Sequence, residues 1–223
     1  MNGNSKLILF DYDGTLVDSE STIVNGIKYA LEFYGYNKPS DTILRQSIGR
    51  ALLPVFQEIT SIDNPEIHSQ LLEKYREWYN LESSKGLIKD TLYSNAKSAL
   101  IKLYKDNYLL GIATNKSRSG LDEGLNRHKI KKYFVSTKTV HDCIPKPSPD
   151  MGLESMSELG VSKVFTIMVG DTVNDALMAK ACGIGFIGVD WGFNKPSVLI
   201  DNGAISVANS FDNLLSEVEK YFS

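Results

Sequence analysis

The stretch Leu7–Thr15 reads Leu-Ile-Leu-Phe-Asp-Tyr-Asp-Gly-Thr, an apolar strand that runs directly into two acidic residues. Residues i and i+2 of a strand point to the same face, so Asp11 and Asp13 can serve one site if the extended backbone continues through them. The Tyr12 side chain should then point away from that site. Gly14 permits a turn that a residue with a β-carbon resists. Two carboxylates at the end of a buried strand are costly without a positive charge between them, and a divalent cation supplies that charge.

The composition is that of an ordinary globular protein: 42% of the 223 residues are hydrophobic and 23% are charged. A net charge of −3 gives no general attraction to nucleic acid or to anionic membranes. We find neither an apolar run long enough to cross a bilayer nor a signal-peptide core. Two cysteines make no disulfide framework, and the three histidines are too far apart in the sequence for a zinc site. We therefore expect a cytoplasmic monomer or homodimer that acts on neither polymeric nucleic acid nor membranes.

Apolar periodicity separates two kinds of region. Residues 19–81 have helical spacing without a convincing strand, whereas helices and strands alternate from residue 95 onward. Strands are predicted at 7–10, 108–113, 133–136, 164–169, 184–189 and 204–208, and the intervening helices at 96–105, 117–128, 149–159, 174–182 and 211–221. Such alternation indicates an α/β fold with a parallel sheet and helices on both faces. The helical block after the first strand is predicted to be a second, inserted domain.

Polar residues follow three of the predicted strands. Ligands of open parallel sheets bind beyond the carboxyl ends of the strands. One edge of this sheet would therefore gather carboxylates, a hydroxyl and an amide from Asp11, Asp13, Thr114, Asn115, Asp171 and Asp175. Lys146 lies between two prolines just before a predicted helix, and these prolines restrict the backbone that carries its ammonium.

Phosphoryl transfer through an aspartate is the chemistry that fits these side chains. Carboxylates with few nitrogen ligands suit Mg²⁺, whose charge lets an anionic nucleophile approach phosphate. One aspartate can form an aspartyl-phosphate, while a second acid two residues away protonates the leaving oxygen and later activates water. The Thr114 hydroxyl, the Asn115 amide and the Lys146 ammonium can hold the non-bridging oxygens.

Four ordered motifs resemble those of the haloacid dehalogenase superfamily, and nearly the whole chain takes part in the resemblance. The motifs are Asp11-Tyr12-Asp13-Gly14-Thr15-Leu16-Val17-Asp18-Ser19, Thr114-Asn115, Lys146-Pro147 and the segment from Gly170-Asp171 to Asp175. The similarity is greatest to the phosphoglycolate phosphatase-like branch. It implies a Rossmann-like catalytic core of residues 1–17 and 88–223, with residues 18–87 inserted as an α-helical cap domain.

The resemblance also implies roles for individual residues. The catalytic set would be Asp11 as nucleophile, Asp13 as acid and base, Thr114 and Lys146. Phosphate would be bound by Gly14, Thr114, Asn115 and Lys146, and Mg²⁺ by Asp11, Asp13 (through its backbone carbonyl), Asp171 and Asp175. In the cap, Arg45 and Arg50 would contact the leaving group of the substrate.

The implied activity is Mg²⁺-dependent hydrolysis of a small phosphorylated metabolite, with phosphoglycolate as the first candidate, through an aspartyl-phosphate. A β-phosphoglucomutase-like phosphotransferase, a pyrophosphatase, a nucleotidase or a sugar-phosphate phosphatase stays open, as does an inactive phosphate-binding regulatory protein. Plainer readings also stay open for the site residues: a polar turn at Asp11 and Asp13, helix caps at Asp171, Asp175 and Thr114-Asn115, and solvated positions for Lys146, Arg45 and Arg50.

Overall fold

The computed structural model describes residues 5–223, and its contacts divide the chain into two compact units. The core unit comprises the chain up to Asp18 together with Leu92–Ser223, and the cap unit is Ser19–Thr91. The boundaries expected from the sequence came after residues 17 and 87, whereas the division comes after Asp18 and Thr91.

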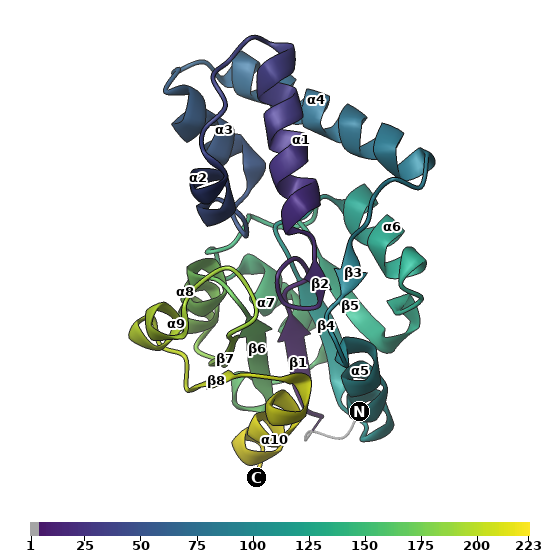
Figure 1. Cartoon of the computed structure of the whole chain (residues 1–223). Coiled ribbons are helices and arrows are strands. Elements are labelled where there is room, and N and C mark those ends of the chain that lie inside the picture. Colours follow the sequence, from purple (N-terminus) through teal and green to yellow (C-terminus); the bar gives the residue numbers. More distant parts are fainter. Residues whose placement is uncertain (1–4) are drawn as a thin grey trace. The chain divides into compact units, whose positions relative to one another are not determined.

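Six parallel strands form the sheet of the core unit, which confirms the predicted fold class (Figure 1). In spatial order they are β5 (Phe134–Lys138), β4 (Leu109–Ala113), β1 (Leu7–Phe10), β6 (Thr166–Gly170), β7 (Gly185–Val189) and β8 (Ser206–Ala208). Leu7 of the central strand β1 pairs in register with Leu109 of β4 and with Thr166 of β6. The carboxyl ends of these three strands therefore lie level with one another.

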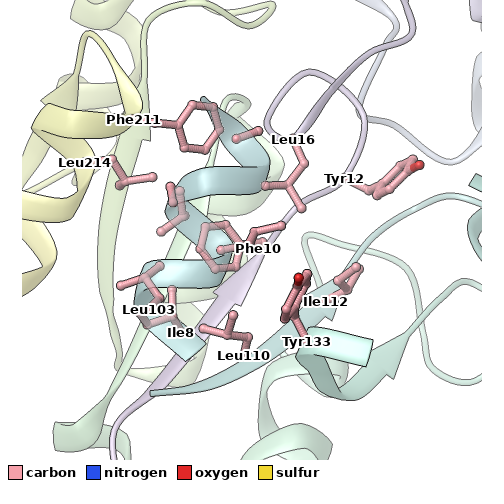
Figure 2. Packing of buried hydrophobic residues seen from close by; sticks show 14 of the residues in the cluster. Ile8, Phe10, Tyr12, Leu16, Leu103, Leu110, Ile112, Tyr133, Phe211 and Leu214 are labelled. Carbon is pink, nitrogen blue, oxygen red and sulfur yellow. The ribbon is translucent and has the colours of Figure 1, made fainter. Parts of the chain in front are cut away.

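Helices cover both faces of this sheet because its buried residues alternate in direction. Ile8 and Phe10 of β1 pack in one cluster with residues of α5, α6 and α10, and Figure 2 labels Phe10, Leu103 and Phe211 of that cluster. Leu7 and Leu9 belong to the opposite cluster, with residues of α7, α8 and α9. The helices are α5 (Ala96–Lys105), α6 (Arg118–Arg127), α7 (Asp150–Leu159), α8 (Val173–Cys182), α9 (Pro196–Asp201) and α10 (Phe211–Tyr221).

The alternation continues beyond the end of β1. Tyr12 is fully buried in the cluster that holds Phe10, where Figure 2 labels it, as expected for a residue whose neighbours Asp11 and Asp13 face elsewhere. The aromatic residue of the Asp11-Tyr12-Asp13 motif therefore belongs to the hydrophobic core and not to the site.

The cap unit is helical, with α1 (Glu20–Phe33), α2 (Asp41–Gln46), α3 (Leu52–Thr60) and α4 (Pro65–Ser84). The start of α4 shows how local sequence sets these bounds: the Asn64 side chain accepts a hydrogen bond from the backbone N–H of Glu66 at 2.9 Å, and Pro65 occupies the first turn. Two short strands, β2 (Val17–Asp18) and β3 (Thr91–Leu92), pair with each other where the chain leaves and re-enters the core unit.

Several local features differ from the sequence-based prediction, and two of them have a clear physical reason. Strand β6 begins at Thr166 rather than at residue 164, because Lys163–Phe165 forms a 3₁₀ turn that leaves Val164 exposed. Helix α9 was not predicted, and its six residues are too few to give a clear periodicity. Among residues 5–223, no helix has both the length and the apolar character that crossing a membrane requires.

Candidate active site

The site lies at the carboxyl ends of β1, β4 and β6. The extended backbone continues one residue beyond the ends of β1 and β4, since the N–H of Asp11 donates to Val169 O at 2.9 Å and that of Thr114 donates to Lys138 O at 3.1 Å. Both Asp11 and Thr114 are 2% exposed. Sheet pairing therefore fixes the backbone positions of Asp11 and Thr114.

Three buried carboxylates meet at this edge. Asp11, Asp171 and Asp175 each offer an oxygen, and these oxygens all lie within 4.8 Å of one another. Lys146 joins them, with Nζ 3.0 Å from Asp11 Oδ1 and 2.6 Å from Asp175 Oδ1. The structure thus brings together four residues that the sequence spreads over 165 positions, and all four are buried.

The backbone of Lys146 is held by the side chain of Asn115. Asn115 Oδ1 accepts a hydrogen bond from Lys146 N at 2.9 Å, and Asn115 Nδ2 donates to Lys146 O at 3.1 Å. Sequence reasoning expected Asn115 on the phosphate. The structure shows both ends of its amide on the segment that carries the lysine, a contact between the loop after β4 and the loop before α7 that sequence spacing does not predict.

The other two carboxylates are also held by the protein. Asp175 Oδ2 accepts hydrogen bonds from the N–H and the hydroxyl of Thr172, at 2.9 and 2.8 Å, at the start of α8. Asp171 Oδ1 accepts from Thr15 Oγ1 at 2.8 Å, and its Oδ2 accepts from Phe193 N at 2.9 Å. Asp175 is therefore a helix-capping acid and a member of the cluster at once.

Two glycines enclose Asp171. Gly14 has a φ of +85°, and a β-carbon there would lie 2.4 Å from Asp171 Oδ2. A β-carbon at Gly192 would lie 2.2 Å from the β-carbon of Asp171. Gly14 is thus needed both for its left-handed backbone and for the space that it leaves to the carboxylate.

Burial dominates the electrostatics of the cluster. Desolvation raises the pKa of Asp11 to about 7, although the Lys146 ammonium opposes this shift. Desolvation also raises the pKa of Asp171 well above its ordinary value, and the neighbouring Asp175 and Asp11 add to the effect. For Lys146, desolvation favours the neutral form, but the Asp11 and Asp175 carboxylates outweigh it and raise the pKa.

These observations test whether the cluster suits a divalent cation. Three carboxylates face a single ammonium, which leaves two negative charges without compensation when all three are ionised. Buried, oxygen-only donor sets of this kind fit Mg²⁺, and an added dipositive charge would favour the ionised carboxylates that burial disfavours. The residues present therefore fit the metal.

The second acid of the motif has a different partner. Both oxygens of Asp13 contact Lys116 Nζ, at 2.9 and 3.0 Å, and the two side chains are 11% and 9% exposed. The Lys116 ammonium also lies 5.6 Å from the centre of the Tyr12 ring. Sequence reasoning missed Lys116, and its only signal was its position directly after Thr114 and Asn115.

The two arginines expected to contact substrate belong to the cap unit and form ion pairs within it. Arg45 Nε lies 3.2 Å from Glu20 Oε2, and Arg50 Nη2 lies 2.7 Å from Glu58 Oε2. The arginine side chains are 52% and 36% exposed.

Comparison with known proteins agrees with this architecture. The family model described as "Haloacid dehalogenase-like hydrolase" matches residues 8–189. "Pyrophosphatase PpaX" of Bacillus velezensis is 34% identical over 82% of each chain, and "Phosphoglycolate phosphatase" of Vibrio parahaemolyticus is 29% identical over 96% of each chain. The crystal structure of a predicted phosphatase from Clostridium acetobutylicum superposes with a TM-score of 0.87 at 25% identity, covering 97% of this chain and 99% of the other.

The family model spans the ends of β1, β4 and β6 and reaches the end of β7, so it contains every core-unit residue of the cluster described above. On this match, and with phosphatase relatives that extend over most of its length, the chain belongs to the haloacid dehalogenase-like hydrolases.

Proposed function

We propose that this haloacid dehalogenase-like phosphatase hydrolyses a small phosphate monoester through an aspartyl-phosphate on Asp11. The observation that carries the proposal is the asymmetry of the Asp11 carboxylate. Oδ1 accepts from Tyr12 N at 2.7 Å and lies 3.0 Å from Lys146 Nζ, whereas Oδ2 accepts no hydrogen bond from any of residues 5–223. This asymmetry supports a role in which one oxygen is held and the other acts as the nucleophile.

Asp11, Asp171 and Asp175, with the backbone carbonyl of Asp13, would hold Mg²⁺. When bound, the metal supplies positive charge that offsets the repulsion between the Asp11 carboxylate and the phosphoryl oxygens. Lys146 supplies part of the same compensation from the protein itself, and Asn115 keeps its backbone in place.

In the first step, Asp11 Oδ2 forms a bond to phosphorus as the ester P–O bond breaks, and protonated Asp13 gives its proton to the leaving oxygen. In the second step, Asp13 accepts a proton from a water molecule whose oxygen attacks the same phosphorus. The bond between phosphorus and Asp11 then breaks, which restores the carboxylate and releases inorganic phosphate. Thr114 and Lys146 would hold the non-bridging oxygens during both steps.

Phosphoglycolate is our first candidate substrate, and the cap arginines Arg45 and Arg50 are proposed to contact its leaving group. One relative is named for phosphoglycolate and another for pyrophosphate, so both kinds of substrate belong in a test. We propose a cytoplasmic site of action, which agrees with the two unpaired thiols Cys143 and Cys182.

The proposal is tested by phosphate release from 2-phosphoglycolate, pyrophosphate, a hexose 1-phosphate and a nucleoside monophosphate, with Mg²⁺ and with EDTA. We expect Mg²⁺-dependent turnover and, after acid quenching, labelled phosphate that stays on wild-type protein but not on Asp11→Asn. Isomerised sugar phosphate without phosphate release would indicate a phosphotransferase instead. Full activity in Asp11→Asn would overturn the proposed mechanism.

A further inference from the structure

We propose that Lys116 binds a second negative charge on the leaving group of the substrate, so that the enzyme selects phosphate esters whose leaving group is an anion. The inference rests on the proposed function, because it uses the role of Asp13 as the residue that meets the leaving oxygen. It deepens that function by naming the chemical class of the leaving group: a carboxylate or phosphate within one or two bonds of the leaving oxygen.

Distance is the first support. Lys116 Nζ lies 2.9 and 3.0 Å from the two Asp13 oxygens, so the ammonium is one hydrogen bond away from the acid that meets the leaving oxygen. Two consecutive hydrogen bonds span at most about 6 Å, and a bent path is shorter. An anionic group attached next to the leaving oxygen extends by about half of that length, which brings it to the ammonium.

The second support is that Lys116 is held in place before substrate binds. Its backbone N–H donates to Thr114 Oγ1 at 3.4 Å, and the next residue, Ser117, caps α6 by accepting from Gly120 N at 3.2 Å. The side chain is only 9% exposed and packs near the Tyr12 ring. Little side-chain entropy remains to be lost when an anion binds, which favours affinity.

Charge is the third support. The nearby Lys146 already lies between Asp11 and Asp175, whereas Lys116 contacts the acid outside that cluster. Proton transfer needs Asp13 and the leaving oxygen but no lysine. An anionic leaving group can form a charge-assisted hydrogen bond to an ammonium beside the general acid, whereas a neutral leaving group cannot.

A rival explanation is that Lys116 only orients Asp13. In that case its removal would slow all phosphate esters alike, whereas an anion-binding residue affects one class selectively. The experiment therefore compares 2-phosphoglycolate with its carboxamide, which has nearly the same shape but a neutral leaving group. kcat/KM is measured for both esters with wild type, Lys116→Gln and Lys116→Arg, and folding of each variant is checked by circular dichroism and thermal melting.

We expect wild type to prefer the carboxylate over the carboxamide by about 10- to 100-fold, the range expected for one charge-assisted hydrogen bond. Lys116→Gln should abolish most of this preference by losing activity on the carboxylate alone, and Lys116→Arg should keep it. Lys131→Gln, which removes an exposed lysine paired with Asp122, is the matched control and should leave the preference unchanged.

Two results would overturn the inference while the proposed function stands: a wild-type enzyme that hydrolyses both esters equally, or a Lys116→Gln variant that loses activity on both to the same extent. If wild type releases phosphate from neither ester, nor from any other member of the phosphate panel, the proposed function fails and the inference fails with it. Because wild type alone gives the first comparison, the test does not depend on the variants folding.

Discussion

The charged side chains of the core unit and those of the cap unit differ in burial. In the core unit, Lys146, Asp11 and Asp175 are all at most 3% exposed and contact one another. In the cap unit, Arg45 and Arg50 pair with glutamates on the surface. Removing one partner of a buried ion pair typically costs about 3–5 kcal/mol, whereas an exposed pair contributes about 0–1 kcal/mol. The core charges are therefore tied to folding, and the cap charges can change with little cost to the fold.

The largest effect should come from Asp11→Asn, which removes the proposed nucleophile. We expect phosphate release to fall by about 10³-fold or more, because the covalent step is lost. Asp201→Asn changes an exposed acid at the end of α9 and is the matched control. Equal phosphate release by Asp11→Asn and wild type would show that Asp11 is not needed for catalysis.

Although Asp11→Asn should lower activity, it should raise the stability of the metal-free protein relative to wild type as the pH increases. Burial raises the pKa of Asp11 from an ordinary value of 3.8 to about 7, so ionising Asp11 costs the folded state free energy. In metal-free wild type, this group's contribution is lost as the pH rises from about 4 through about 7. In EDTA, the stability of Asp11→Asn relative to wild type should therefore rise over that range, by on the order of 4 kcal/mol at pH 8 in thermal melting, because about three pKa units correspond to about 1.4 kcal/mol each. A difference between the two proteins that does not change with pH would contradict this.

Lys146→Met measures how much the buried ammonium contributes to the free energy of unfolding. It leaves the buried carboxylates without their ammonium, and we expect a loss of about 3–5 kcal/mol in the free energy of unfolding in EDTA, together with loss of activity. Lys131→Met removes an exposed lysine and should stay within about 0.5 kcal/mol of wild type in denaturant titrations. Similar values for the two variants would mean that burial does not distinguish these lysines.

Asn115→Ala should have an intermediate effect, because it removes two hydrogen bonds to the Lys146 backbone. We expect a loss of about 2 kcal/mol of stability and a decrease in kcat that exceeds the increase in KM. A purely structural role would lower the melting temperature and leave kcat unchanged. Asn126→Ala, at an exposed position of α6, provides the control.

The smallest stability effects are expected in the cap. Arg45→Ala and Arg50→Ala should each change the free energy of unfolding by less than about 1 kcal/mol, yet raise KM several-fold if these arginines contact substrate. Glu20→Ala and Glu58→Ala break the same ion pairs and keep the arginines. Raised KM values in the arginine variants alone would support substrate contact, and equal changes in both members of a pair would contradict it.

The fold was largely predictable because its signals are local. The helices at Ala96–Lys105 and Phe211–Tyr221 have the bounds that apolar periodicity predicts, and strand Leu7–Phe10 is apolar throughout. The start of β6 was misplaced because Val164 and Phe165 have strand propensity, while the chain there forms a 3₁₀ turn.

The site was predictable as a set of residues and less so as a set of contacts. Strand ends and motifs identified Asp11, Asp171, Asp175 and Lys146. The hydrogen bond from Phe193 N to Asp171 and the amide of Asn115 on Lys146 join segments that are 22 and 31 residues apart. Such pairings arise from tertiary packing, which periodicity and spacing do not encode.

The pairing of β2 with β3 has a consequence for engineering. Leu16 O accepts a hydrogen bond from Tyr93 N at 3.1 Å, so the chain leaves and re-enters the core unit at adjacent points. Segments whose ends lie close together can be exchanged with little disturbance to the host fold. Ser19–Thr91 can accordingly be exchanged as one segment, and chimaeras that carry the corresponding segment of a relative would test whether this segment sets the substrate range.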